Sequence, residues 1–225
     1  YFYQNSLIRV FIMFEIVLGG IMFPVIRGVA SAIPNSIVTN TELVKRYPKI
    51  LSQERIIEKC GIVERRSVRG EMTCSELAVK AIENLIANTN LKSSEIDLVI
   101  LATLTPDCFF PSTAALIIDK LGLEVANGYD TGAACSGFIY GIDDACCRLW
   151  AGGPYKDRWR KIVVCSSEIM SSTLNAFDYR TGLLFGDAAS AVLIERGDVE
   201  SRGFKINNTL TKMVKDHVGE VYFKS

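Results

Sequence analysis

Apolar residues recur along the chain with two spacings, one typical of helices and one of strands. The clearest helix pattern covers Thr73–Thr89, where apolar residues follow one another at intervals of three and four. Continuous apolar runs over Asp97–Thr103 and Lys161–Ser167 predict strands that are buried on both faces of a sheet. Two further strands are predicted over Phe23–Ala32 and Ser190–Glu195.

The segments between these strands carry signals that predict helices. Polar capping residues predict short helices that begin near Thr39 and Ser52, and Gly61 is expected to end the second of them. Apolar helices are predicted over Ser112–Leu121 and Gly137–Trp150.

Two weaker strand signals complete the pattern. Val125–Tyr129 leads into a strand, and Gly203–Leu210 carries only a weak strand signal. Strands that alternate with helices are typical of βαβ units. We therefore expect an α/β fold with a mostly parallel sheet that helices cover on both faces.

The N-terminal 22 residues differ from the rest. Tyr1–Met22 is apolar, but Arg9 and Glu15 interrupt it, which fits neither a spanning helix nor a signal peptide. We interpret it as an upstream extension in preference to a targeting segment. The expected organisation is an extension over 1–22, one domain over 23–200, and a segment over 201–225 that begins the connection to a second half.

The composition narrows the class of protein. Apolar residues make up 49% and charged residues 22%, which suits a folded core. The 25 basic and 25 acidic residues balance, so charge gives no reason to expect nucleic acid or an anionic membrane as partner. Seven cysteines without a C-x-x-C pair, and the single His217, favour free thiols in a reducing cytoplasm over a disulfide framework or a metal site.

One cysteine stands in a distinctive setting. The segment Asp130–Phe138 (DTGAACSGF) surrounds Cys135 with small residues at a predicted junction between strand and helix. A thiol at a helix N-terminus meets the positive end of the helix dipole, which favours the reactive thiolate and suits acyl transfer. Spacing alone leaves two interpretations of Cys135 open, a nucleophile or one buried thiol among seven.

Further motifs occur in a fixed order along Phe23–Glu195. They are Gly28–Asn40, Gly61–Arg66, Ile96–Asp107, Phe110–Ala114, Asp130–Phe138, Ser166–Glu168 and Leu184–Ala191. Together they resemble the N-terminal half of β-ketoacyl-[acyl-carrier-protein] synthase III, a condensing enzyme with the thiolase fold. The resemblance implies a thiolase-like α/β half of βαβαβαββ order, with a mixed, mostly parallel five-stranded sheet.

The resemblance also implies an activity and its residues. Cys135 would accept an acyl group from a thioester, with its backbone N–H in an oxyanion hole, and condense it with malonyl-acyl carrier protein with loss of CO2. Phe110 would shape the acyl pocket across a homodimer interface, while Arg55 and Lys59 would bind an acyl-CoA or acyl-carrier donor. No metal or other cofactor is implied. Asp187 would have a structural role near the site.

The sequence departs from this family in two respects. Family members that use CoA often stack the adenine on a tryptophan, and this sequence has Arg55 at the corresponding position. The family also uses a histidine and an asparagine from its second half, and His217, Asn207 and Asn208 match neither motif. An alternative therefore stays open, in which the chain is a catalytically incomplete half that acts only as a structural or partner subunit. A different thiolase-fold synthase is a weaker alternative.

Overall fold

The computed structural model describes residues 22–46, 52–124, 126–151, 157–174, 179–198 and 200–212. The expected extension over 1–22 lies outside these ranges except for Met22, and so does His217. In the part of the chain that is described, no helix has the length and apolar character needed to cross a membrane.

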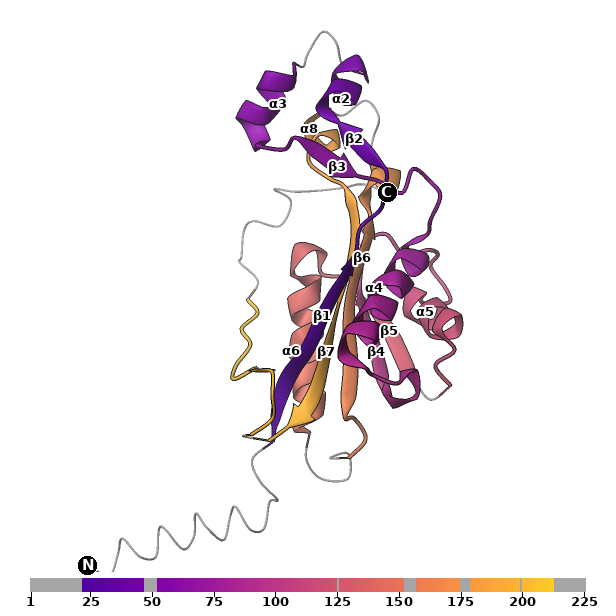
Figure 1. Cartoon of the computed structure of the whole chain (residues 1–225), viewed down its shortest axis with the longest axis vertical. Helices are drawn as coiled ribbons and strands as arrows, with labels where there is room; N and C mark the ends of the chain where they lie inside the picture. The colour runs from indigo at the N-terminus through magenta and orange to yellow at the C-terminus, as the bar shows by residue number, and fades with distance from the viewer. Residues whose placement is uncertain are drawn as a thin grey trace, which may run out of the picture.

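A six-stranded sheet forms the centre of the molecule (Figure 1), with the order β5-β4-β6-β7-β1-β8. Its strands are β1 (Phe23–Ala32), β4 (Leu98–Ala102), β5 (Asn127–Thr131), β6 (Lys161–Ile169), β7 (Asp187–Gly197) and β8 (Phe204–Lys205). β4 pairs in parallel with β5 and β6, while β7 runs antiparallel to both β6 and β1. Since β1, β4, β5 and β6 point the same way, the mixed, mostly parallel sheet is confirmed, but it has six strands and not the expected five, because β8 is added at the edge beside β1. Only two residues of the weak signal over 203–210 form a strand, β8, which pairs with β1.

Helices cover both faces of the sheet, as predicted (Figure 1). α4 (Cys74–Thr89) and α5 (Thr113–Leu121) lie on one face, and α6 (Gly137–Trp150) lies on the other. The side chains of β4 alternate between the two layers. Leu101 belongs to the core beneath α4, whereas Ile100 belongs to the core beneath α6. This two-sided burial is why the strand sequence is apolar throughout.

The helix ends follow the capping signals in the sequence. Thr73 and Glu76 form a reciprocal capping box at the start of α4, with the Thr73 N–H donating to Glu76 Oε2 at 2.9 Å. Ser52 caps α3 (Gln53–Cys60), and Gly61 ends it in the left-handed conformation at φ 69°.

A small lobe lies beyond the carboxyl end of the parallel strands (Figure 1). It contains α2 (Asn40–Arg46), α3, α8 (Tyr179–Gly182) and a two-stranded sheet of β2 (Ile37–Thr39) and β3 (Glu64–Arg66). β2 and β3 were not predicted from the sequence, because strands of three residues are too short to show an alternating apolar pattern.

The core beneath α4 generates a stability prediction. Leu85 is fully buried there, whereas Leu184 is 47% exposed. Leu85→Ala should lower the free energy of unfolding by about 2–5 kcal/mol, because it removes buried apolar surface and leaves a cavity. Urea unfolding followed by circular dichroism measures the change. Leu184→Ala is the matched control, and an equal loss in both variants would contradict this assignment of the core.

Candidate active site

Cys135 lies where a parallel strand meets a helix. β5 ends at Thr131, a 3-10 turn covers Ala134–Ser136, and α6 begins at Gly137. The Cys135 side chain is exposed. The structure therefore places this thiol at the junction that the sequence predicted, at the carboxyl end of the strands and the start of a helix.

The backbone around Cys135 is tightly constrained. Ala134 adopts the left-handed region at φ 46°, which non-glycine residues seldom occupy. Gly137 brings the start of α6 against β4, since a Cβ there would lie 3.3 Å from the Ala102 Cβ. One turn further, a Cβ on Gly141 would lie only 2.8 Å from Val164 Cγ1 of β6. The helix can approach the sheet this closely because both positions lack a side chain.

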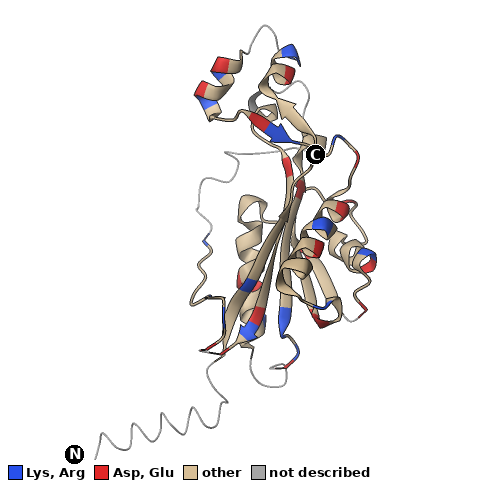
Figure 2. Ribbon diagram, in the orientation of Figure 1, with Lys and Arg blue, Asp and Glu red and all other residues tan. Residues whose placement is uncertain are grey.

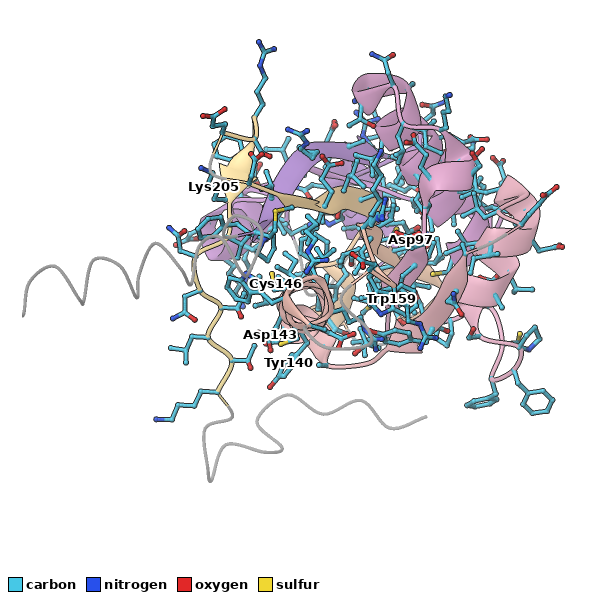
Figure 3. The ribbon with its side chains drawn as sticks, turned by 90° about the horizontal axis from the view of Figure 1, so that it is seen from below. Asp97, Tyr140, Asp143, Cys146, Trp159 and Lys205 are labelled. Carbon is cyan, nitrogen blue, oxygen red and sulfur yellow. The ribbon has the colours of Figure 1, made fainter. Side chains whose placement is uncertain are left out.

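The two sides of α6 differ in polarity. In the view from below (Figure 3), Cys146 lies on the sheet-facing side of α6, while Tyr140 points away from the sheet. Cys146 is buried, and its burial raises the pKa of the thiol to about 11. Asp143 of α6 accepts a hydrogen bond from the Thr209 hydroxyl, so the segment after β8 also contacts this helix.

A carboxylate fixes the strand that leads to Cys135. Asp130 Oδ2 accepts a hydrogen bond from the Thr113 N–H, and Asp130 Oδ1 accepts one from the Ala114 N–H, both at 2.7 Å. These amides belong to the first turn of α5, where the helix dipole favours a negative charge. Asp130 thereby ties the end of β5 to α5 just before the cysteine.

A second carboxylate holds the loop after β4. Glu168, at the end of β6, accepts hydrogen bonds from the Leu104 N–H and the Thr105 hydroxyl, each at 2.9 Å. Burial raises the pKa of Glu168, although these hydrogen bonds oppose the shift. Neither carboxylate was predicted from the sequence as a positioning group. The signal available in the sequence was an acid at or near the end of a predicted strand, in the segments Asp130–Phe138 and Ser166–Glu168.

Phe110 lies further along the same loop and is 86% exposed. This exposure excludes a place in the core for its ring, which leaves its predicted role at an acyl pocket as a proposal. Its neighbour Phe109 is 99% exposed. The loop thus presents two aromatic rings outward.

The predicted donor-binding residues lie together on α3. Arg55 is in the first turn and Lys59 in the last, and both side chains are exposed. Residues four apart lie on the same face of a helix. The structure therefore brings this pair together, on the lobe and not on the main sheet.

Asp187 has the structural role that the sequence indicated. Its buried carboxylate accepts hydrogen bonds from the Val68 N–H at 2.8 Å and from the Ser171 N–H at 2.8 Å. It joins the start of β7 to the segment after β3 and to α7 (Met170–Thr173). A carboxylate engaged in this way stabilises the base of the lobe.

The other cysteines divide by exposure. Cys74, Cys146 and Cys165 are buried, and burial raises the pKa of each thiol, which disfavours the thiolate. Cys108 and Cys147 are exposed, as Cys135 is. Exposure alone does not distinguish Cys135, but its place between strand and helix does. In the described part of the chain, no cluster of metal-binding side chains is present.

Glu168 generates a prediction about pH. Its pKa is raised above 4.5 by burial, so the folded protein holds this proton more tightly than the unfolded chain does. The stabilisation is complete below the unfolded-state pKa and is lost as the pH rises through the folded-state pKa. Relative to Glu168→Gln, the unmodified protein should lose free energy of unfolding over that range, measured by urea unfolding at successive pH values. Glu83→Gln, at an exposed site on α4, is the control. A difference that does not change with pH would contradict the prediction.

Known proteins are similar to this chain both in sequence and in fold. Residues 129–212 match the family described as 3-oxoacyl-[acyl-carrier-protein (ACP)] synthase III. The chain is 39% identical over 172 residues to beta-ketoacyl-[acyl-carrier-protein] synthase III 2 of Bacteroides thetaiotaomicron, covering 76% of this chain and 49% of that protein. It is 41% identical over 170 residues to beta-ketoacyl-[acyl-carrier-protein] synthase III of Streptococcus suis, covering 76% and 50%.

The crystal structure of 3-oxoacyl-[acyl-carrier-protein] synthase III from Aquifex aeolicus VF5 superposes with a TM-score of 0.71 at 36% identity, over 79% of this chain and 55% of that one. The chain spans about half the length of the curated relatives it matches. The matched residues 129–212 include Cys135 and the whole of α6. In sequence and fold, the chain resembles the N-terminal half of 3-oxoacyl-[acyl-carrier-protein] synthase III proteins over about three quarters of its own length.

Proposed function

We propose that this protein is an acyltransferase of fatty-acid or related polyketide synthesis, in which Cys135 carries the acyl group. The observation that supports this most directly is the position of the Cys135 thiol, exposed at the start of α6 and within the family's matched region. A helix start supplies unpaired backbone donors and a positive dipole end. Both suit a sulfur that must act as a nucleophile.

The first step is acyl transfer from a thioester to Cys135. The thiolate attacks the thioester carbonyl, and a tetrahedral intermediate forms with negative charge on its oxygen. We assign the backbone N–H of Cys135 as one donor to that oxygen. When the intermediate collapses, the bond to the donor sulfur breaks, the donor thiolate leaves and takes up a proton, and the acyl group stays on Cys135.

The second step is condensation with malonyl-acyl carrier protein. The malonyl group loses CO2, and the carbon left behind attacks the carbonyl on Cys135. A carbon–carbon bond forms, the cysteine thiolate leaves, and a β-ketoacyl product results. This step uses the histidine and asparagine of the family. The acyl-accepting step is therefore the one that residues identified in this sequence support.

The remaining site residues have supporting roles. We assign Arg55 and Lys59 to the acyl-CoA or acyl-carrier donor, since both are basic and share one face of α3. Phe110 would contribute to the acyl pocket of a partner subunit in a homodimer, which suits its outward ring. A cytoplasmic setting accords with the exposed free thiols.

Selective labelling tests the nucleophile. Iodoacetamide at limiting concentration should modify Cys135 several-fold faster than Cys108 or Cys147, because only Cys135 precedes a helix start. An acyl-CoA should transfer its acyl group to Cys135 alone, with peptide mass spectrometry as the readout. Cys147→Ser should leave this acylation unchanged, and Cys135→Ser should abolish it. Equal alkylation of all three exposed thiols, together with no acylation, would instead favour a purely structural subunit.

The donor assignment has its own test. Replacing both Arg55 and Lys59 by alanine should slow acylation by acyl-CoA about tenfold, because two charged contacts to the donor are lost. Iodoacetamide carries no such group, so its reaction with Cys135 should not change. Lys80→Ala, an exposed position on α4, is the control. Slower reaction with both reagents would mean that the double variant disturbs the thiol itself.

A further inference from the structure

Four arginines line one cavity in the lobe. The cavity has a volume of about 420 Å³ and is lined by Arg46, Arg65, Arg66 and Arg69, together with the serines Ser67 and Ser171 and several apolar residues. Its walls come from the end of α2, from β3 and the residues after it, and from α7. Figure 2 shows basic residues on β3 and at the end of α2 in this lobe.

Arg65 is the most informative of the four, because its charge is buried. The side chain belongs to a residue that is 6% exposed. Its Nε donates to the Leu183 carbonyl at 2.7 Å, its Nη1 donates to Asn40 Oδ1 at 2.6 Å, and its Nη2 also donates to the Leu183 carbonyl. Both acceptors are neutral, and within the described ranges no carboxylate forms an ion pair with Arg65. Desolvation lowers the pKa of this guanidinium. A buried charge of this kind is costly until an anion compensates it.

The other three arginines share two carboxylates. Arg69 pairs with Glu42 at 3.0 Å, and Arg46 reaches the same glutamate at 3.9 Å. Arg66 lies 3.6 Å from Glu64. Neither glutamate lines the cavity. The charged side chains that line the cavity are all basic, while Glu42, Glu64 and Asp187 offset part of this charge from outside the lining.

We propose that this cavity binds a small anion that carries a phosphoryl group. Guanidinium groups present paired N–H donors that match phosphate oxygens. The serine hydroxyls are already engaged, since Ser67 Oγ donates to Ser171 Oγ at 3.1 Å and Ser171 Oγ donates to Asp187 Oδ2 at 2.6 Å, so the arginines supply the donors to the anion. A volume of about 420 Å³ exceeds that of inorganic phosphate and suits a phosphorylated small molecule.

The cavity is separate from the residues assigned to acyl transfer. Cys135, Arg55 and Lys59 are absent from its lining. The proposal therefore does not rest on the proposed function. The phosphoryl group could belong either to a free metabolite or to the thioester donor, and the experiment separates these sources.

Binding of inorganic phosphate tests the site. Equilibrium dialysis with labelled phosphate, at constant ionic strength set by chloride, should show saturable binding of one phosphate per chain. Replacing Arg46 and Arg66 together by glutamine should weaken this binding by about tenfold or more, because two charged donors are lost. Arg202→Gln removes an exposed arginine outside the cavity and should leave binding unchanged.

Three results would overturn the proposal: no saturable binding, the same affinity in the double variant, or an equal loss in Arg202→Gln. Circular dichroism establishes that each variant is folded. If the double variant fails to fold, Arg46→Gln replaces it, since that side chain is 55% exposed and its single ion pair is long. It should then weaken binding several-fold, and unchanged affinity would overturn the site.

Two further measurements identify the source of the phosphoryl group and test the anion site separately from the proposed acyl transfer. If coenzyme A displaces labelled phosphate one for one, the cavity binds a phosphoryl group of the thioester donor. If phosphate stays bound in the presence of coenzyme A, the cavity binds a separate anion. Cys135→Ser should retain full phosphate binding. Loss of acylation with phosphate binding intact would therefore refute the proposed function alone.

Discussion

The close packing of α6 against β4 and β6 sets the position of the Cys135 thiol. Two glycines on the helix, Gly137 and Gly141, face Ala102 and Val164, where an added Cβ would lie only 3.3 Å and 2.8 Å away. The helix start therefore lies close against the carboxyl end of β4, and Cys135 lies in the 3-10 turn just before it. A larger residue at Gly141 would require Val164 or the helix to shift, whereas one at Gly137 would require a smaller adjustment.

Polar contacts then shape the surroundings of the thiol. Asp130 ties the end of β5 to α5, and Glu168 ties the end of β6 to the loop after β4. Each carboxylate accepts hydrogen bonds from backbone amides of a neighbouring segment, so each defines a backbone path that apolar contacts alone leave free. The lobe depends in the same way on Arg65 and Asp187. The core on either face of the sheet is held by apolar contacts, whereas hydrogen bonds to charged side chains hold the region around the candidate site.

This division explains how much the sequence could predict. Thr73–Thr89 and Gly137–Trp150 were recognisable because their burial produces a regular apolar spacing, and the fully buried β4 was recognisable as a continuous run. The five long strands and the main helices followed from such patterns. The position of Cys135 followed from the same patterns, since it lies between two of these elements. Its role came from motif order, which spacing could not supply.

Long-range polar contacts left no comparable pattern. Glu168 and Leu104 are far apart in sequence, and so are Arg65 and Leu183, and no local rule relates the members of either pair. The small sheet of β2 and β3 escaped prediction for a related reason, since its three-residue strands depend on the surrounding lobe more than on their own composition. Packing against a core produces a regular spacing of apolar residues in the sequence, whereas a single hydrogen bond between distant residues produces no such spacing.

The left-handed conformation of Ala134 has a consequence for the stability of the segment that carries Cys135. A non-glycine residue holds that conformation at a cost of about 1–2 kcal/mol, and the folded strand and helix on either side maintain it. Loosening of the first turn of α6 would release this local cost. Under gradual heating, the surroundings of the Cys135 thiol should therefore change while most of the sheet is still intact.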